Sequence, residues 1–254
     1  LGHLSFLAKV RFAFSILTNP VLFMLDKLGL IKSPLYCTKN GMVVATRPKT
    51  SDINDAIVVL SGNEYPEKLL GITGKENPVV LDCGGHIGSF SLWAKHVNPS
   101  SKVFAMEPVI DNLELLKQNL SLNKHADVTV IPFALYGQSG HFYINLDGRP
   151  FDAGQVVSIR PATGKYFEID ALTISEVLAQ NGLTAVDLLK MDIEGSEYSV
   201  INAGLEVLAK SVRRIIMEYH TDSHTNGRDE IVTALTANNN FALIYESRNV
   251  LGFQ

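Results

Sequence analysis

The stretch "NPVVLDCGGHIGSFSL" (residues 77–92) decides the fold of this chain. Its first apolar run ends at Asp82, three glycines follow within seven residues, and a second apolar run begins after them. A short apolar run closed by glycines is typical of a buried strand that ends in a tight turn. We therefore expect a strand, a turn and a helix here, with a small extended ligand lying against the turn.

The length and composition of the chain suit one large domain, or a domain with a modest extension. Of its 254 residues, 46% are hydrophobic and 19% are charged, so a sizeable core is available. The 22 Lys and Arg residues against 26 Asp and Glu residues give a net charge of −4, without the basic excess that a nucleic-acid partner requires. The two cysteines, Cys37 and Cys83, cannot form a disulfide framework, which fits a reducing, cytoplasmic compartment.

The N-terminal stretch, residues 12–31, is apolar but interrupted by Pro20 and closed by Asp26. Its uninterrupted part is shorter than the ~20 apolar residues that span a bilayer, and it lacks the cleavage site of a signal peptide. We predict a pair of short helices that pack on the body or on a second copy of the chain. The alternative is a peripheral membrane contact, with Lys9 and Arg11 facing the headgroups.

A repeating order of segments follows the glycine turn. We expect strands within residues 78–84, 102–108, 127–135, 185–192, 213–220 and 241–246. We expect helices within residues 88–97, 111–123, 174–182, 195–210 and 227–239. Strands that alternate with helices predict a doubly wound α/β fold, in which a mostly parallel sheet is covered on both faces.

Two parts of the chain fall outside this order. Residues 141–146 and 155–159 are expected to form an antiparallel pair or an irregular excursion. Residues 42–48 are expected to form a strand after a tight turn at Asn40-Gly41. We therefore divide the chain into an N-terminal helical and strand extension with a cap, residues 1–75, and a ligand-binding domain, residues 76–254.

The glycine turn favours one kind of cofactor. In such a sheet, ligands lie outside the carboxyl ends of the strands, where residues 82–88 are expected. The dinucleotide fingerprint G-x-G-x-x-G is broken, because Cys83 takes the first glycine position when Gly85 and Gly88 are aligned. Pyrophosphate prefers bare N–H groups, whereas Asp82 adds negative charge beside the turn. S-adenosylmethionine, with a sulfonium, an ammonium and no phosphate, fits better.

A second acid supports this cofactor. Glu107 ends the next expected strand, roughly 20 residues further on, where a carboxylate can accept hydrogen bonds from ribose hydroxyls. Because NAD would use the same acid, Glu107 alone does not discriminate between the two cofactors. Asp82, the turn of Gly84, Gly85 and Gly88, and Glu107 together predict S-adenosylmethionine binding.

Five motifs carry a family resemblance. They are "RPKTSDI" (47–53), "VLDCGGHIGSFSL" (80–92), "EP" (107–108), "FALYG" (133–137) and, the most specific, "DLLKMDIEGSE" (187–197). Through these motifs most of the chain resembles the FkbM family of S-adenosylmethionine-dependent methyltransferases. The resemblance implies a Rossmann-like class I methyltransferase with a seven-stranded sheet. It also implies O-methylation of a hydroxyl on a sugar, a glycan or a polyketide-like small molecule.

The chain departs from the family at two positions. His86 stands where the family usually has Asn, which affects the cofactor contacts, and "ALT" (171–173) stands where "TLD" is more frequent, which removes an acid. The resemblance also implies that Glu64 belongs to a lid, and Ala134 is placed to flank the adenine or to fill the core. The expected cofactor-binding residues are Asp82, Gly84, Gly85, His86, Gly88, Glu107, Pro108, Ala134 and Glu64.

Candidate catalytic groups end the fourth and fifth expected strands. The enzyme must align donor and acceptor, and a neutral hydroxyl must also lose its proton. Asp192 follows the fourth strand, and Glu218 and His220 end the fifth. We predict a metal-free site with Asp192 or His220 as the general base; the alternative is a divalent cation bound by all three. Glu194 and Glu197 fit the first turn of the next helix, where negative charge is favourable.

Lys190 interrupts the fourth apolar strand and is expected to pair with a neighbouring acid. Two other functions stay open. One is a nucleotide-dependent oxidoreductase, which Cys83 and Asp82 disfavour. The other is a non-catalytic cofactor-binding module of an assembly. For the favoured enzyme, the expected partner is a small-molecule or glycan hydroxyl acceptor.

Overall fold

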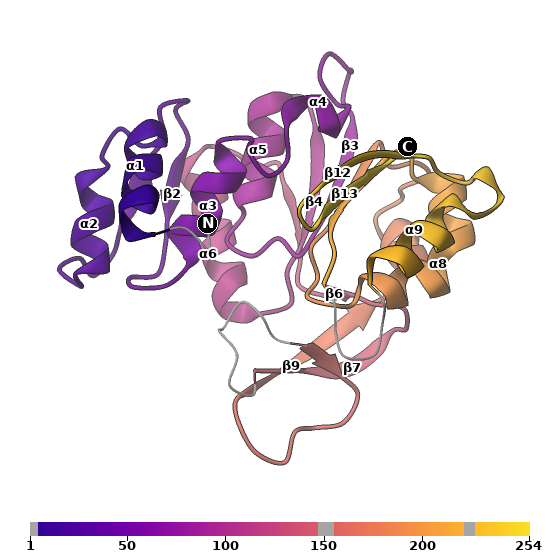
Figure 1. The fold of residues 1–254 in the computed structure, drawn as a ribbon. Coiled ribbons are helices and arrows are strands. Elements are labelled where there is room, and N and C mark those ends of the chain that lie inside the picture. Colours follow the sequence, from indigo (N-terminus) through magenta and orange to yellow (C-terminus); the bar gives the residue numbers. More distant parts are fainter. Residues whose placement is uncertain (1–4, 147–154, 221–226) are drawn as a thin grey trace.

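A seven-stranded sheet forms the centre of the computed structural model, which describes residues 5–146, 155–220 and 227–254 (Figure 1). The strands lie in the order β12-β13-β11-β10-β3-β4-β5. Their bounds are β3 (Val79–Cys83), β4 (Lys102–Met106), β5 (Thr129–Ile131), β10 (Leu188–Met191), β11 (Ile215–Glu218), β12 (Leu243–Ser247) and β13 (Val250–Phe253). From β5 to β11 the strands run parallel, whereas β13 and β12 are antiparallel to their neighbours. The doubly wound, mostly parallel α/β fold is confirmed.

Helices cover both faces of this sheet, because both faces of its strands are apolar. Neighbouring residues alternate between two buried clusters: Val80 and Leu188 belong to one, and Leu81 and Leu189 to the other. The first face is covered by α3 (Asp52–Leu60), α5 (Ser89–Val97) and α6 (Ile110–Leu122). The second is covered by α7 (Ile174–Gln180), α8 (Glu197–Ser211) and α9 (Arg228–Thr236), of which α8 and α9 are labelled in Figure 1.

A second, four-stranded sheet lies beside the carboxyl end of the central one and projects below it in Figure 1. Its order is β6-β9-β7-β8, with bounds β6 (Ala134–Leu135), β9 (Tyr166–Leu172), β7 (Gly140–Asn145) and β8 (Gln155–Val157). The antiparallel pair expected from residues 141–146 and 155–159 is confirmed as β7 and β8. The single strand expected over 127–135 is wrong, because Pro132 divides it into β5 and β6, which belong to different sheets.

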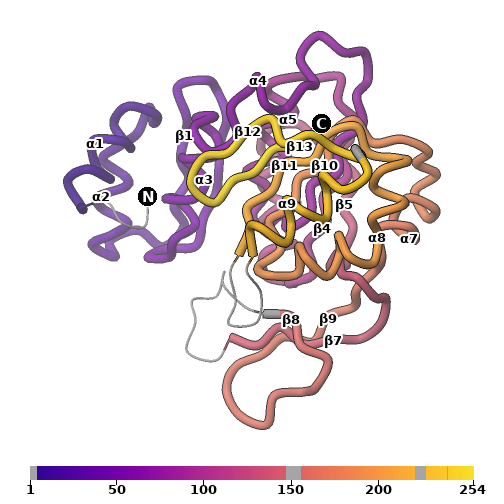
Figure 2. The backbone as a smooth tube through the Cα atoms, turned by 45° about the vertical axis from the view of Figure 1, so that its right-hand side comes forward, coloured from indigo at the N-terminus to yellow at the C-terminus, as the bar shows by residue number. Residues whose placement is uncertain are grey.

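The chain ends in a hairpin that supplies the last two strands of the central sheet. β12 pairs with β13, and β13 pairs with β11, all antiparallel. The hairpin crosses in front of the central strands in Figure 2. Tyr245 of β12 packs against the large cluster that also contains Ile57 and Leu60 of α3. The C-terminal hairpin and α3 thus contribute to the same buried layer.

The N-terminal part begins with two short helices, as predicted, α1 (Phe6–Ile16) and α2 (Val21–Lys27), followed by the hairpin β1 (Leu35–Cys37) and β2 (Val43–Ala45) and later by α4 (Glu67–Leu70). Ala13, Phe23 and Tyr36 are fully buried in the cluster that also contains Leu92 of α5, so this part packs on the body. Phe6, Leu7, Leu28 and Leu30 stay exposed. Contact of this face with a membrane or a second copy stays a prediction, as does the domain boundary at residue 75. Within the described residues, no helix is long and apolar enough to cross a membrane.

Two asparagines, Asn119 in α6 and Asn123 just after its end, hold β2 against the body. Asn119 is fully buried; its Oδ1 accepts from Ala45 N at 2.7 Å and its Nδ2 donates to Ala45 O at 3.1 Å. Asn123 makes the same pair of bonds to Val43. The two side-chain amides therefore occupy the free edge of β2 as a neighbouring strand would. Asn119 Nδ2 also donates to Ile87 O in the glycine turn at 2.8 Å.

Candidate active site

A cavity of about 960 Å³ opens at the carboxyl ends of the central strands. Its lining includes the segments that follow four neighbouring strands, namely residues 84–86, 106–109, 192–194, and 218 with 220. Residues 63–65 close a second side, and residues 133–135 of the second sheet close a third. Because ligand cavities commonly measure about 300–1,000 Å³, this volume accommodates a nucleoside cofactor and part of an acceptor.

The glycine turn is fixed by contacts that leave no room for side chains. Gly84 and Gly85 both donate to Met106 O, at 3.1 and 2.8 Å. Gly84 has φ +78°, and a Cβ there would lie 1.8 Å from the carbonyl oxygen of Asp192. Gly88 does not line the described cavity; it precedes α5, and a Cβ there would lie 3.3 Å from Leu116 Cγ. Gly88 thus packs against Leu116, and its predicted cofactor contact stays a prediction.

Asp82 lies beneath the turn, and its predicted role in cofactor binding stays a prediction. Its side chain is 0% exposed and is not part of the cavity lining. Ser91 Oγ donates to its Oδ2 at 2.7 Å, and Lys190 Nζ lies 3.4 Å from its Oδ1. Burial raises the pKa of Asp82, while the charge of Lys190 opposes this. The acid therefore acts on the site through Lys190.

Lys190 pairs with acids, as predicted, and joins three parts of the site. Its Nζ donates to Gly84 O at 2.8 Å and lies 3.8 Å from Asp192 Oδ2. Burial by itself would lower the pKa of Lys190, but the charges of Asp82 and Asp192 more than offset it, and the pKa lies above its usual value. The ammonium is therefore charged and fixes the position of Asp192 relative to the glycine turn.

Glu107 faces the cavity from the end of β4 and is held by three donors. His86 N and Val109 N donate to it at 2.8 and 2.9 Å, and Asn112 Nδ2 donates at 3.2 Å. Although these bonds favour the carboxylate, burial raises the pKa of Glu107 to about 7. The His86 side chain turns away toward the N-terminal part, where its Nε2 lies 3.0 Å from Arg47 Nη2. His86 thus positions Glu107 through its backbone.

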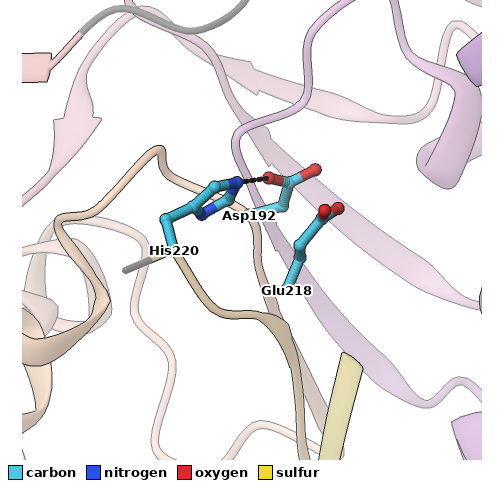
Figure 3. A group of neighbouring side chains, drawn as sticks. All are labelled: Asp192, Glu218 and His220. Atoms are coloured by element: carbon cyan, nitrogen blue, oxygen red, sulfur yellow. Dashed lines mark ion pairs between the residues drawn. The ribbon is translucent and has the colours of Figure 1, made fainter. Parts of the chain in front are cut away.

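Asp192, Glu218 and His220 come together on another part of the cavity wall (Figure 3). His220 Nε2 lies 3.9 Å from Asp192 Oδ1 and 3.6 Å from Glu194 Oε2. Its other nitrogen, Nδ1, lies 3.0 Å from Glu197 Oε1. Because β10 and β11 are parallel neighbours, residues just after both strands meet at one edge, as expected from the sequence.

The charged groups around Asp192 change one another's pKa values. Burial and the charges of Glu218 and Asp192 raise the pKa of Glu64 to about 8. Burial, with the charge of Asp192 and against that of His220, raises the pKa of Glu194 to about 8. Burial would lower the pKa of His220, but the hydrogen bond and charge of Glu197 raise it to about 10. His220 is therefore an imidazolium at neutral pH when the cavity holds no cation.

Two contributors to this site are missed by reasoning from the sequence. Glu197, expected to decorate a helix end, is 1% exposed and binds His220. Asn249 Nδ2 donates to Glu218 Oε1 from the C-terminal hairpin, which no local pattern links to β11. Tyr65 is 1% exposed, and its hydroxyl has no hydrogen-bond partner among the described residues. Glu64, Pro108 and Ala134 line the cavity as expected.

Comparison with known proteins identifies the family. The model of the methyltransferase FkbM domain matches residues 82–243. Methyltransferase sdnD of Sordaria araneosa is 27% identical, with 56% of this chain and 66% of that protein covered. The 31-O-demethyl-FK506 methyltransferase FkbM of Streptomyces tacrolimicus is 25% identical (69% and 77% covered), and the 2-O-methyltransferase NoeI of Sinorhizobium fredii is 23% identical (71% and 79% covered).

Among solved structures, the methyltransferase FkbM from Methylobacillus flagellatus superposes with a TM-score of 0.51 at 20% identity. The match covers 76% of this chain and 47% of that one, so the chain spans about half the length of the solved protein. The seven-stranded sheet and the glycine turn after β3 are those expected from the family resemblance, and the family model matches the part of the chain that contains them. The chain belongs to the FkbM methyltransferase family and is an S-adenosylmethionine-dependent methyltransferase.

Proposed function

We propose that this methyltransferase acts on a hydroxyl of a sugar, a glycan or a polyketide-like small molecule. The observation that carries the proposal is that the cavity lining holds two chemically different groups of residues. Gly84 and Glu107 suit the nucleoside of the cofactor, and Asp192, Glu218 and His220 suit a group that must lose a proton. The names of two relatives, a 2-O-methyltransferase and a 31-O-demethyl-FK506 methyltransferase, support a hydroxyl acceptor.

The cofactor residues follow from the geometry of the first group. We assign Glu107 to the ribose hydroxyls, because its carboxylate is fixed by donors and lines the cavity. Pro108 and Ala134 supply apolar surface for the adenine. Gly84 and Gly85 let the cofactor approach the backbone. Glu64 lines the same cavity, and although its pKa is raised to about 8, the cationic methionine end of the cofactor favours its ionised form.

The chemistry follows from the second group. The bound sulfonium supplies an activated methyl group, so the protein's task is to align the acceptor and to accept its proton. His220 is an unsuited base while Glu197 keeps it protonated. Asp192 faces the cavity and is fixed by Lys190, so we assign the proton to this carboxylate within the group of Asp192, Glu218 and His220.

Cofactor and acceptor are tested separately. In calorimetry, S-adenosylhomocysteine is expected to bind in the micromolar range and NAD to show no binding, because the turn lacks the phosphate-binding glycine and stands above buried Asp82. Transfer of a labelled methyl group into sugar, glycan and polyketide hydroxyls then tests the acceptor. Binding of NAD without S-adenosylhomocysteine overturns the cofactor, and label recovered only on nitrogen or carbon overturns the hydroxyl acceptor.

The affinity for the cofactor is expected to depend on pH through Glu107. A carboxylate accepts from two hydroxyls and a carboxylic acid does not, so binding favours the ionised form. Since the pKa of Glu107 in the free protein is about 7, affinity for S-adenosylhomocysteine should fall as pH drops below 7, approaching tenfold per unit, and level off above it.

Calorimetry between pH 5.5 and 8.5 measures this dependence. Glu64 and Glu194, with pKa values of about 8, add their own dependence at higher pH. The matched variant is Glu107→Gln, which should bind more weakly at pH 8 and lose the dependence between pH 6 and 7. An identical pH profile in the variant would remove Glu107 from the cofactor site.

A further inference from the structure

We propose that Asp192, Glu218 and His220 form a binding site for one divalent cation, of the Mn²⁺ or Mg²⁺ type, against which the acceptor hydroxyl binds. The inference deepens the proposed function and rests on it, because the cation acts on the hydroxyl of that reaction. It departs from the metal-free site that the sequence favours. The reasons are three observations that only the structure provides.

The first observation is the convergence of three ligand atoms. One oxygen of Asp192, one oxygen of Glu218 and one imidazole nitrogen of His220 lie within 4.8 Å of one another. All three side chains are half-buried and come from the ends of adjacent parallel strands, β10 and β11 (Figure 3). Two carboxylate oxygens and one imidazole nitrogen are ligands that Mn²⁺ accepts, and the open cavity leaves positions for water and substrate.

The second observation is the support behind these ligands. The Glu197 carboxylate binds His220 Nδ1 at 3.0 Å, so Nε2 is the nitrogen that faces Asp192. Glu197 is itself fixed, because Ile193 N donates to the same oxygen at 3.1 Å. Asn249 donates to Glu218 from the C-terminal hairpin. A carboxylate behind the histidine and a donor behind the acid are the supports that orient ligands in metal sites.

The third observation is independent of the cluster. Tyr65 is 1% exposed and lines the same cavity, yet its hydroxyl has no partner among the described residues. The charges that act on this hydroxyl include those of Asp192 and Glu218. A buried hydroxyl without a partner is unfavourable. A water bound to the cation gives the hydroxyl of Tyr65 its missing partner.

The charge of the cavity also favours a cation. Six carboxylates belong to its lining: Asp55, Glu64, Glu107, Asp192, Glu194 and Glu218. The Lys and Arg side chains in the same lining are Lys190 and Arg248. His220 lines the same cavity as a third cationic side chain, so carboxylates outnumber cationic side chains in this lining by six to three. A divalent cation beside Asp192 and Glu218 adds positive charge where carboxylates gather.

The step balances as follows. The acceptor oxygen binds the cation, which lowers the pKa of its O–H group. The O–H bond breaks and the proton goes to the oxygen of Asp192 that does not bind the cation. The oxygen's electron pair forms the bond to the methyl carbon while the carbon–sulfur bond breaks toward sulfur. The products are a methyl ether and S-adenosylhomocysteine, and the cation is unchanged.

The direct test measures Mn²⁺ binding by electron paramagnetic resonance on the full chain after treatment with a chelator. The wild-type protein is expected to bind one Mn²⁺, and Mg²⁺ in excess is expected to displace it. Asp192→Asn, Glu218→Gln and His220→Ala should each weaken binding by about tenfold or more, and Glu197→Gln by about tenfold. Glu206→Gln, an exposed change on the same helix as Glu197, should leave binding unchanged.

Binding of S-adenosylhomocysteine, measured on every variant and with or without chelator, separates the two proposals. If the cofactor analogue binds but Mn²⁺ does not, or if Mn²⁺ binding is equal in all the variants, the cation site is overturned and the proposed function stands. If S-adenosylhomocysteine fails to bind wild-type protein, the proposed function itself fails. Loss of methyl transfer with chelator and its return with Mn²⁺ or Mg²⁺ supports the site, and transfer that persists in chelator overturns it.

Discussion

Lys190→Met is expected to lower the free energy of unfolding by about 3–5 kcal/mol, because it leaves a buried carboxylate without its cation. Asp82 is 0% exposed, and the ammonium of Lys190, 3.4 Å away, is the cation that faces it. The substitution also removes the donor to Gly84 O in the glycine turn. We therefore expect cofactor affinity to fall together with stability.

Urea denaturation at pH 7 measures the loss. The matched control is Lys75→Met, which breaks the ion pair of Lys75 with Asp187 at the surface, where both side chains are partly exposed. Exposed pairs contribute about 0–1 kcal/mol, so the control should change little. The double variant Asp82→Asn with Lys190→Met should recover much of the loss. Equal losses for Lys190→Met and Lys75→Met would show that the buried pair is not what stabilises this part.

Gly84→Ala is expected to cost about 2–5 kcal/mol and to abolish cofactor binding. The residue has φ +78°, a conformation that costs about 1–2 kcal/mol for a residue with a Cβ. The added Cβ would lie 1.8 Å from the carbonyl oxygen of Asp192, so the backbone must move, and overpacking of this kind costs about 1–3 kcal/mol. The movement displaces both the glycine turn and Asp192.

Gly74→Ala separates the two costs. Gly74 has φ +72°, but a Cβ there meets nothing within 4 Å. Its substitution should therefore show only the cost of the backbone conformation and leave binding of S-adenosylhomocysteine intact. Thermal denaturation and calorimetry of the two variants make the comparison. If the two alanine variants are equally stable and bind the cofactor equally, the close approach of Gly84 to Asp192 has no importance for the site.

The order of strands and helices is predictable from the sequence because each segment carries its own pattern. The turn at Gly84 and the acids after β4, β10 and β11 are visible in the same way, since the carboxyl ends of parallel strands must share one edge. β13 is not predicted, because "VLGF" is short and follows the charged residues of its own hairpin. Its place in the sheet is decided by pairing with β11. β9 is not predicted, because it belongs with β6, β7 and β8 to the second sheet, outside the alternation of strands and helices.

The misplaced parts of the site have a common physical cause. Sequence position shows that Asp82 ends a strand but not which way its side chain points, and the pleat of β3 turns it inward toward Lys190. The first-turn position of Glu197 is typical of an exposed helix end, yet contact with His220, 23 positions away, buries it. Such partners come from tertiary packing, which no local pattern encodes.

The side-chain amides of Asn119 and Asn123 make the hairpin of β1 and β2 part of the cofactor's binding equilibrium. Asn119 donates to both β2 and the glycine turn, and Arg47, just after β2, contacts His86 in that turn. A ligand that orders the turn therefore also orders the N-terminal hairpin. By thermodynamic reciprocity, detachment of the hairpin from these asparagines lowers the affinity for the ligand. Amide hydrogens of Val43 and Ala45, both bonded to these asparagines, should exchange more slowly once S-adenosylhomocysteine is bound.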